Sequence, residues 1–456
     1  MHKLERTIFE TSRAAEYFDV RELQTQTGQR RENFPTVVFK ELVDNALDAC
    51  EAAGVAPRVD IHARVGGDTA ELTISDNGPG IPPDLVGKVL NFDTRTSDKA
   101  AYRSPTRGAQ GNALKTVVGI PYALGGKAPM IIEARGQRHT IRAWQDPAGE
   151  IHTPHAVDEM SDSGGTRVSI SVPFDEGMDY NPEHWARSFA LFNPHAWVVA
   201  DIGSYPGNSG TAKTAKTYKP TAAFPGWRKF LPTDLTSAHW YGAGALQRLV
   251  FSHIKHARTG GRDLPLGEFV RQFRGLSSTA KAKAVTAGFG DIKYLSDFQE
   301  RPDRVVDLLT AMQATAKAPS HNVLGVVGEE HFRTYFEDAY EVKESVYKTA
   351  KGRFPSGLPF VFEFALATLE TPGDLYFGIN FSPSFGDPLV GTQLVGPKFA
   401  AEGIRGFLRE SYALPDSGGS YHGYRAPANV AVAVHIITPA PVFMDRGKSR
   451  LQLEEV

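Results

Sequence analysis

The chain has 456 residues, of which 41% are hydrophobic and 22% charged, the proportions of an ordinary globular protein with about two to four domains. Its net charge of −2 argues against a protein that coats nucleic acid over its whole surface, although a local basic patch remains compatible with it. The single cysteine, Cys50, excludes intrachain disulfides and cysteine-based metal cages, and the lack of an export signal or of an apolar run of ~18 residues favours a cytoplasmic protein with no membrane partner.

The first element in chain order is a helix, predicted for the stretch "FKELVDNALDACEAAG". Pro35 suits the first helical turn, and Gly54 suits the residue just past the end. Glu41, Asn45 and Asp48 follow one another at intervals of four and three residues, so their side chains share one face. Apolar residues fill most of the remaining circumference. The helix is therefore expected to be largely buried, and its polar stripe is costly unless something pairs with it.

Strand patterns follow this helix directly. The stretches "VDIHARV" and "ELTIS" alternate like two half-buried strands joined by a Gly-Gly-Asp turn, and "PMIIEARG", "HTIRAWQ" and "GTRVSISVPF" continue the pattern. Residues 1–225 are therefore predicted to form an α+β unit with a mostly antiparallel sheet.

Two further units are expected after this one. Residues 226–334 contain short amphipathic helices separated by Gly and Pro, among them "GALQRLVFSHIKHAR", "LGEFVRQFRG", "TAKAKAVTAGF" and "RVVDLLTAMQATA". Residues 335–456 form a second α+β unit, with strands predicted at "PFVFEFALA", "DLYFGINFS", "GTQLVG" and "NVAVAVHIITPAPVF" and a helix at "AEGIRGFLRESY".

Two motifs in the first unit carry candidate chemistry. In "SDNGPGIP", a strand delivers the acceptor-only side chain of Asp76, while Gly78 and Gly80 allow the backbone to approach a flat ligand closely. A carboxylate there suits the amine of a purine. The second motif, "RGAQGNALK", is a Gly-rich turn that leads into a predicted helix, where backbone N–H groups form a cradle for phosphate oxygens. Taken alone, each motif is weak, because most such sequences are turns.

The order of these motifs gives a stronger signal. Four motifs follow one another in a fixed order: E-x-x-x-N-x-x-D on a helix, D-N-G-x-G-I after a strand, a Gly-rich loop and "SGGTRVSI". This order resembles the ATP-binding fold shared by gyrase, mismatch-repair clamps, heat-shock chaperones and histidine kinases. Within that class, "FKELVDNALDACEAAG", "TRGAQGNAL" and "SRAAEYFD" are most similar to the B subunit of type IIB topoisomerases, the topoisomerase VI group. "LGEFVRQF" and "NVLGVVGEEHF" resemble its helix-two-turn-helix insert, and "GRFPSGLPFVFEFALA" and "AVAVHIITPAPVFMDRGKS" its transducer domain.

This resemblance implies an α+β chain with a Bergerat-type (GHKL) ATP-binding sandwich at residues 1–225, a helix-two-turn-helix-like insert at residues 226–334 and a transducer-like domain at residues 335–456. The implied cofactors are ATP and Mg²⁺. The topoisomerase subunit continues past its transducer into a helical segment that docks on the DNA-cleaving A subunit, whereas this sequence ends at "RLQLEEV". The third unit is therefore expected to lack the usual C-terminal extension.

The resemblance also implies roles for individual residues. Glu41 would be the general base that activates the attacking water, and Asn45 would ligate Mg²⁺. Asp76 would bind the adenine amine directly and through a water that Thr166 shares. Lys448 would be the transducer lysine that senses the γ-phosphate. The remaining implied nucleotide contacts are Asp48, Gly78, Gly80, Ile81, Gly108, Ala109, Gln110, Gly111, Asn112, Ala113, Leu114 and Lys115.

Three of these residues have simpler alternatives. Asp48 could instead be the partner of another side chain or a charge on the helix surface. Lys115 could point to solvent rather than hold phosphate, and Lys448 could be a charge in a frayed tail. Cys50 is predicted to be plain core packing.

A local excess of positive charge suggests a DNA contact. Between Phe251 and Lys283 there are seven basic and two acidic residues, a local net charge of +5 within a chain of net charge −2. Such a patch would bind duplex DNA through its phosphates without distinguishing sequence. Its basic members are Lys255, Arg258, Arg262, Arg271, Arg274, Lys281 and Lys283.

Two functions remain open from the sequence. The first is an ATP-gated clamp that forms a homodimer on ATP binding, closes on duplex DNA, works with an A-type DNA-cleaving subunit and associates with the nucleoid when engaged. The second is a nucleotide-controlled interaction switch, chaperone-like or defence-related, without topoisomerase activity. A sensor kinase is disfavoured, because no phospho-accepting histidine helix precedes the ATP motifs.

Overall fold

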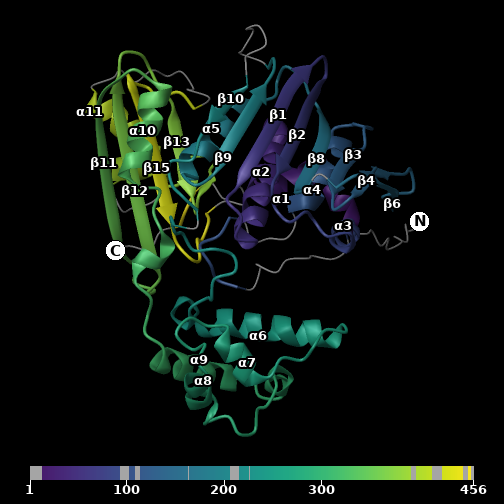
Figure 1. The fold of residues 1–456 in the computed structure, drawn as a ribbon, viewed down its shortest axis with the longest axis vertical. Coiled ribbons are helices and arrows are strands. Elements are labelled where there is room, and N and C mark those ends of the chain that lie inside the picture. The colour runs from purple at the N-terminus through teal and green to yellow at the C-terminus, as the bar shows by residue number, and fades with distance from the viewer. Residues whose placement is uncertain are drawn as a thin grey trace, which may run out of the picture.

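Two β-sheets lie side by side in the molecule, and a group of helices lies apart from both (Figure 1). The computed structural model describes residues 13–92, 102–107, 113–162, 164–205, 215–224, 226–391, 397–412, 424–444 and 450–452. In these ranges, no helix is both long and apolar enough to cross a membrane.

The first sheet has eight strands in the order β10-β9-β1-β2-β8-β3-β4-β7. Only β1 and β9 pair in parallel, so the mostly antiparallel sheet predicted from the sequence is confirmed. The hairpin that follows the first long helix is also confirmed. The strands are β1 (Arg58–Gly66), β2 (Thr69–Asp76), β3 (Met130–Ala134), β4 (Gln137–Ile141), β7 (His155–Glu159), β8 (Thr166–Pro173), β9 (Trp197–Ile202) and β10 (Lys216–Tyr218), with β5 (Trp144–Gln145) and β6 (Ile151–His152) forming a separate ribbon.

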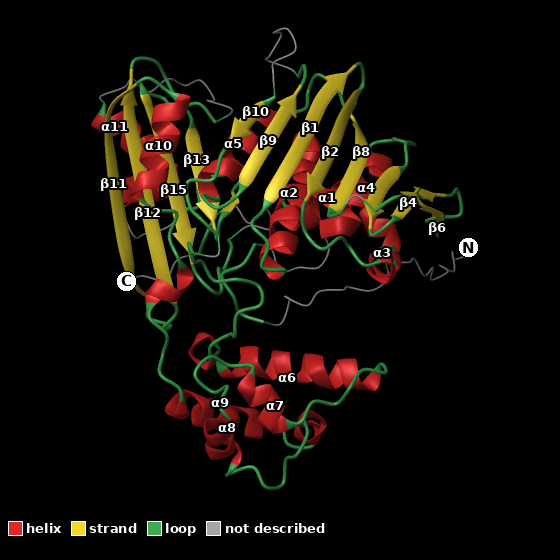
Figure 2. Cartoon of the chain, in the orientation of Figure 1, coloured by secondary structure: helices red, strands yellow, loops and turns green. Residues whose placement is uncertain are grey.

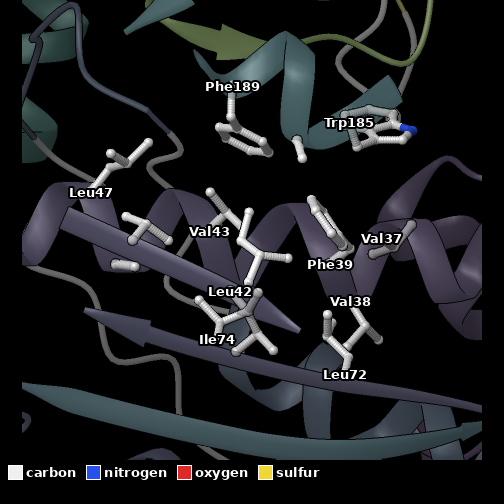
Figure 3. Packing of buried hydrophobic residues seen from close by; sticks show 14 of the residues in the cluster. Val37, Val38, Phe39, Leu42, Val43, Leu47, Leu72, Ile74, Trp185 and Phe189 are labelled. Atoms are coloured by element: carbon white, nitrogen blue, oxygen red, sulfur yellow. The ribbon is translucent and has the colours of Figure 1, made fainter. Parts of the chain in front are cut away.

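Helices cover one face of this sheet (Figure 2). The central helix, α2 (Phe34–Ala52), has its proline in the first turn as predicted, and Gly54 just beyond its end has φ +71°. Figure 3 shows Val38 and Leu42 of α2 facing Leu72 and Ile74 of β2, while other α2 side chains face Phe189. Because α2 packs on both sides, it is largely buried, as expected from its sequence. The other helices of this layer are α1 (Val20–Thr27), α3 (Pro83–Val89), α4 (Ala113–Ala123) and α5 (Pro182–Phe192).

The separate helical unit confirms the four helices predicted between residues 226 and 334. They are α6 (Ala243–Arg258), α7 (Leu266–Arg271), α8 (Thr279–Thr286) and α9 (Arg304–Thr315). Their apolar faces enclose a core of their own around residues such as Leu246, Phe269 and Leu308. The unit therefore has the independent core that a domain requires.

The second sheet has five strands in the order β11-β12-β15-β13-β14. These are β11 (Val342–Arg353), β12 (Pro359–Leu369), β13 (Leu375–Ile379), β14 (Ser382–Pro383) and β15 (Val430–Ile437). The stretch "DLYFGINFS", predicted as one strand, is instead two strands separated by a tight turn at Asn380 and Phe381. The strand predicted at "GTQLVG" falls mostly outside the described residues.

Two helices accompany the second sheet, α10 (Glu329–Ala339) and α11 (Pro397–Ser411). Helix α10 crosses the boundary predicted at residues 334 and 335, and it packs on α5 rather than on the helical unit: the Tyr335 hydroxyl donates to the Arg187 carbonyl at 2.9 Å. The two boundaries between the three predicted domains remain a prediction. The fold itself is the expected α+β arrangement, and one face of the second sheet shares a core with α2 and α5.

Candidate functional site

The candidate site begins where β2 ends. The side chain of Asp76 accepts hydrogen bonds from the backbone N–H groups of Gly78, at 2.8 Å, and of Thr166, at 3.2 Å. The Thr166 hydroxyl in turn accepts from the backbone N–H of Ile81 at 3.2 Å. Because β2 and β8 are neighbours, residues 90 positions apart in the sequence meet at one edge of the sheet. The structure thus brings Asp76, the glycine turn and Thr166 together.

Burial makes the Asp76 carboxyl group a weaker acid than usual. It raises the pKa of this carboxyl group to about 6, and the hydrogen bonds from Gly78 and Thr166 only partly offset that effect. Of the two carboxylate oxygens, Oδ1 takes both backbone bonds. A partly buried carboxylate whose ionised form is disfavoured is typical of a ligand-binding position, because a bound donor would stabilise the charge.

Three glycines leave room around Asp76. A Cβ atom on Gly78 would lie 2.9 Å from Asp76 Oδ1, and one on Gly80, which has φ +74°, would lie 3.0 Å from the carbonyl oxygen of Gly165. Gly165 is the most confined: it has φ +70°, and a Cβ atom there would lie 1.8 Å from the backbone oxygen of Asp76. Sequence analysis did not single out Gly165, although the Gly-Gly pair immediately before Thr166 was a usable signal.

An apolar cavity lies next to this turn. Ile81 lines it, and the backbone of Ile81 is tied to Thr166, so the cavity adjoins the Asp76 cluster. The cavity volume is about 10 Å³, room for about one water molecule, so a flat heterocycle that carries an amine would enter only if the apolar walls move apart. Helices α3 and α4 and strands β3 and β4 supply its other walls, which are Val86, Leu90, Leu114, Met130, Ile132 and Ile141.

The polar stripe of α2 has two half-buried members. Within the described ranges, Glu41 has no hydrogen-bond partner, and the side-chain nitrogen of Asn45 is buried without one. An amide oxygen beside a carboxylate is a suitable ligand set for Mg²⁺ together with phosphate oxygens and waters, so the residues present fit that ion.

Asp48, the third member of the stripe, has a protein partner. Its Oδ1 atom accepts from Arg107 Nη1 at 2.9 Å. This is the alternative in which Asp48 pairs with another side chain, and a direct contact with nucleotide remains a prediction. Lys115 is 1% exposed, and its Nζ donates to the carbonyl oxygen of Asn91 at 2.6 Å, so the alternative that it points to solvent is wrong.

Arg107 belongs to a buried ion cluster that sequence analysis missed. Its guanidinium forms two 2.9 Å hydrogen bonds with Glu51, and Glu51 also contacts His195 at 2.8 Å and Lys229 at 2.7 Å. Glu51 and Arg107 have no exposed side-chain surface. Asp44, Asp48 and Glu51 recur at helical spacing on α2, a signal that could have indicated a buried basic partner.

The charges in this cluster depend on one another. Burial alone would raise the pKa of Glu51, yet Arg107 and Lys229 hold it well below its usual value. Burial lowers the pKa of Lys229 to about 8 and that of His195 to about 4. Glu51 therefore stays ionised at neutral pH, and His195 stays neutral.

Several predicted site residues lie outside the described residues. These are Gly108, Ala109, Gln110, Gly111, Asn112 and Lys448. On either side of the glycine-rich segment, Arg107 ends one described range, and Ala113 and Leu114 begin helix α4, as predicted for a turn that leads into a helix.

Comparison with known proteins agrees with this site. Residues 31–176, which include α2, the Asp76 turn and Thr166, match the family described as histidine kinase-, DNA gyrase B-, and HSP90-like ATPase. These residues form an ATPase domain of this family. Such a domain binds nucleotide.

The topoisomerase likeness comes from curated relatives, each named as the B subunit of type 2 DNA topoisomerase 6. The protein of Pyrococcus furiosus is 30% identical over 175 residues, which is 36% of this chain and 30% of the relative. That of Thermococcus sibiricus is 35% identical over the same shares. The protein of Methanococcoides burtonii is 26% identical over 341 residues, or 72% of this chain and 51% of the relative. The chain thus spans between about a third and a half of the length of these relatives.

Solved structures give a weaker likeness. The ATPase region of Saccharomyces cerevisiae topoisomerase II aligns over 91% of this chain and 76% of its own, at 11% identity and a TM-score of 0.39. The ATPase and transducer domains of topoisomerase II from Balamuthia mandrillaris align with 12% identity and a TM-score of 0.37.

We expect Gly165→Ala to lower stability far more than Gly164→Ala. Both glycines have positive φ, so each substitution costs about 1–3 kcal/mol of backbone strain. The Cβ at Gly164 would meet nothing within 4 Å, whereas that at Gly165 would collide with the backbone of Asp76. Urea unfolding measures both. Equal losses would show that the Gly165 contact does not constrain the turn.

Asp76→Asn should stabilise the protein while weakening nucleotide binding. The folded-state pKa of about 6 exceeds the unfolded value of 3.8, so the ionised group lowers stability at pH 7, and this loss shrinks as the pH falls from about 6 to 3.8 and is absent below 3.8. A neutral amide should raise the free energy of unfolding at pH 7 by about 1–3 kcal/mol and give little gain at pH 4.

Thermal unfolding at both pH values, with and without an ATP analogue, measures the two effects of Asp76→Asn. Asp60→Asn on the adjacent strand, where Asp60 pairs with Arg58, is the matched control and should leave nucleotide binding unchanged. In the wild type, affinity should fall as the pH drops below about 6. An Asp76→Asn protein that binds nucleotide normally would contradict the assignment.

Proposed function

We propose that this chain is the ATP-binding and ATP-hydrolysing subunit of a type IIB topoisomerase-like complex. In this proposal, ATP binding joins two copies into a clamp on duplex DNA, and an A-type subunit cleaves the DNA. The observation that carries it is the joined cluster of Asp76, Ile81 and Thr166 beside an apolar cavity, within a domain that matches the ATPase family.

Each site residue has a role in this proposal. Asp76 binds the adenine amine, Thr166 shares the water beside it, and the apolar residues that line the cavity move apart to pack against the ring. Glu41 takes a proton from the attacking water, which requires a carboxylate that is not already committed to a protein cation. Mg²⁺, when bound, would neutralise phosphate charge, and Asn45 would hold it. Residues 108–115 surround the phosphates, and Lys448 contacts the terminal phosphate from the transducer.

Nucleotide controls the clamp through a difference in affinity. To move a population from 1:99 to 99:1 in favour of the closed dimer, ATP must bind that state about 10⁴-fold more tightly than the open one. A contact with the terminal phosphate supplies such a difference because it is lost after hydrolysis. The transducer lysine, proposed as Lys448, would provide it.

The helical unit is the proposed contact with DNA, which would place the engaged protein on the nucleoid in the cytoplasm. All seven basic residues named for this patch are solvent-exposed on or near α6, α7 and α8. Among the described residues, only Arg262 of this set is paired with an acidic side chain, that of Glu268. Exposed, largely unneutralised cations support a sequence-independent interaction with phosphates.

Dimerisation by light scattering, with Mg²⁺ and a non-hydrolysable ATP analogue, tests the clamp. We expect dimers in the wild type and in Glu41→Ala, and loss of hydrolysis in Glu41→Ala alone, by about 10²- to 10⁴-fold for a missing general base. Glu71→Ala, an exposed strand residue, is the control and should retain hydrolysis. A chain that binds nucleotide yet stays monomeric would favour the interaction switch.

DNA affinity as a function of salt tests the helical unit. Reversing two charges on α8, with Lys281→Glu and Lys283→Glu together, should weaken binding equally for all sequences and reduce the slope of log K against log salt by about 2. The control pair, Lys348→Glu and Lys351→Glu on β11, should leave the slope unchanged. Wild-type protein without salt-sensitive affinity for duplex DNA would rule out the clamp.

A further inference from the structure

The turn between β13 and β14 has an unfavourable backbone. Asn380 has φ +51° and Phe381 has φ +65°, the positive-φ pair of a two-residue hairpin turn, which asparagine adopts readily but which costs phenylalanine free energy. The turn is held in place by the buried Asn380 side chain, which accepts from the backbone N–H of Thr438 at 2.9 Å and donates to its carbonyl oxygen at 3.1 Å. A strained turn that is held this firmly indicates that its geometry matters for something else.

The turn contacts helix α2 through a hydroxyl group. Ser382 Oγ donates to Asp44 Oδ2 at 2.8 Å and accepts from Lys40 Nζ at 2.9 Å, and Lys40 and Asp44 pair with each other at 2.7 Å. Lys40 and Asp44 immediately precede Glu41 and Asn45 in the sequence. The second sheet therefore contacts α2 beside both residues that the proposed function assigns to catalysis and to the metal.

The turn also contacts the residue before the glycine-rich segment. The carbonyl oxygen of Phe381 accepts from Arg107 Nε at 3.2 Å and from Asn193 Nδ2 at 3.0 Å. Arg107 is the last described residue before the segment proposed to surround the phosphates. The same guanidinium binds Asp48 and Glu51 of α2, so one turn of the second sheet is joined to both parts of the proposed ATP site.

On its other side, the turn is tied to the centre of the second sheet. The Phe381 N–H donates to His435 Nε2 at 3.0 Å, which leaves His435 Nδ1 to donate to Glu363 at 2.9 Å. Glu363 also accepts from the backbone N–H groups of Val327 and Gly328, both at 2.9 Å. Glu363 and His435 are fully buried on β12 and β15. An unbroken series of buried hydrogen bonds thus runs from the sheet to α2.

We propose that the β13–β14 turn is a positioning element for the ATP site, through Ser382 on α2 and through the Phe381 carbonyl on Arg107. The proposal rests on the function proposed above and adds a route by which movement of the second sheet reaches Glu41 and Asn45. Apolar surfaces tolerate sliding, whereas directional hydrogen bonds between buried groups are lost on small displacements. This route is separate from any contact that Lys448 makes.

Ser382→Ala tests the turn with little risk to folding, because it removes one hydroxyl and leaves the Lys40–Asp44 pair in place. We expect kcat for ATP hydrolysis to fall about tenfold while the Kd for nucleotide stays within about twofold of wild type. Ser384→Ala is the matched control: it is also buried, two residues further on, and its hydroxyl accepts only from the nearby backbone N–H of Gly386 among the hydrogen bonds described. Ser382→Thr keeps the hydroxyl and should recover most of the lost rate.

Amide hydrogen exchange of α2 gives a second readout that needs no turnover. Exchange at residues 38–48 should increase in Ser382→Ala and remain as in wild type in Ser384→Ala. Equal kcat values and equal exchange in the two alanine variants would overturn the proposal. Wild-type protein that binds ATP without hydrolysing it would contradict the proposed function instead, and the exchange comparison would still decide whether the turn orders α2.

Discussion

The buried ion cluster of Arg107 and Glu51 is the interaction on which most of the arrangement depends. Two charges without exposed surface are stabilised only if their partners stay in place, and removing one member of such a pair typically costs about 3–5 kcal/mol. The partners of these two residues come from α2, from Asn193 and His195 after α5, from Lys229 before the helical unit and from the turn of the second sheet. Correct placement of one unit is therefore a condition for the stability of the others.

In contrast to the Arg107 cluster, the proposed ATP site contains polar groups that the protein does not fully pair. The arginine cluster satisfies its charges within the protein, whereas burial of Asp76 disfavours the ionised carboxylate, and Asn45 leaves a buried amide nitrogen unpaired. Such groups lower the stability of the nucleotide-free protein and gain partners when a ligand binds. The two kinds of polar group lie along one helix, with Glu51 held rigidly at its end and Asn45 two turns earlier. Helix α2 thus carries one charge that the protein holds in a buried ion cluster and one amide nitrogen that it leaves unpaired.

In the second sheet, buried hydrogen bonds also hold the turn at Asn380 and Phe381 in place. Its two residues adopt positive φ and remain there because buried side chains hold them from both sides. An element of this kind has a defined position relative to both sheets, so it can transmit a displacement between them. The helical unit has a separate core and contributes Lys229 to the buried cluster from the segment that precedes it. In the proposed clamp, this unit would contact DNA and take no part in the chemistry.

Local pattern determined much of the secondary structure, and the resemblance of the ordered motifs to a known ATPase class supplied the candidate nucleotide contacts. Helical spacing placed Glu41 and Asn45 on one face of α2, and strand alternation placed Asp76 at the end of a hairpin, because both periodicities are properties of neighbouring residues. The exposed strand β11 was missed because its side chains do not alternate between apolar and polar. Contacts between residues far apart in the sequence could not be predicted from local patterns. Arg107 meets Glu51 across 56 positions and Ser382 meets Asp44 across 338, and only the packing of the two sheets on α2 decides that these charges and hydroxyls face one another.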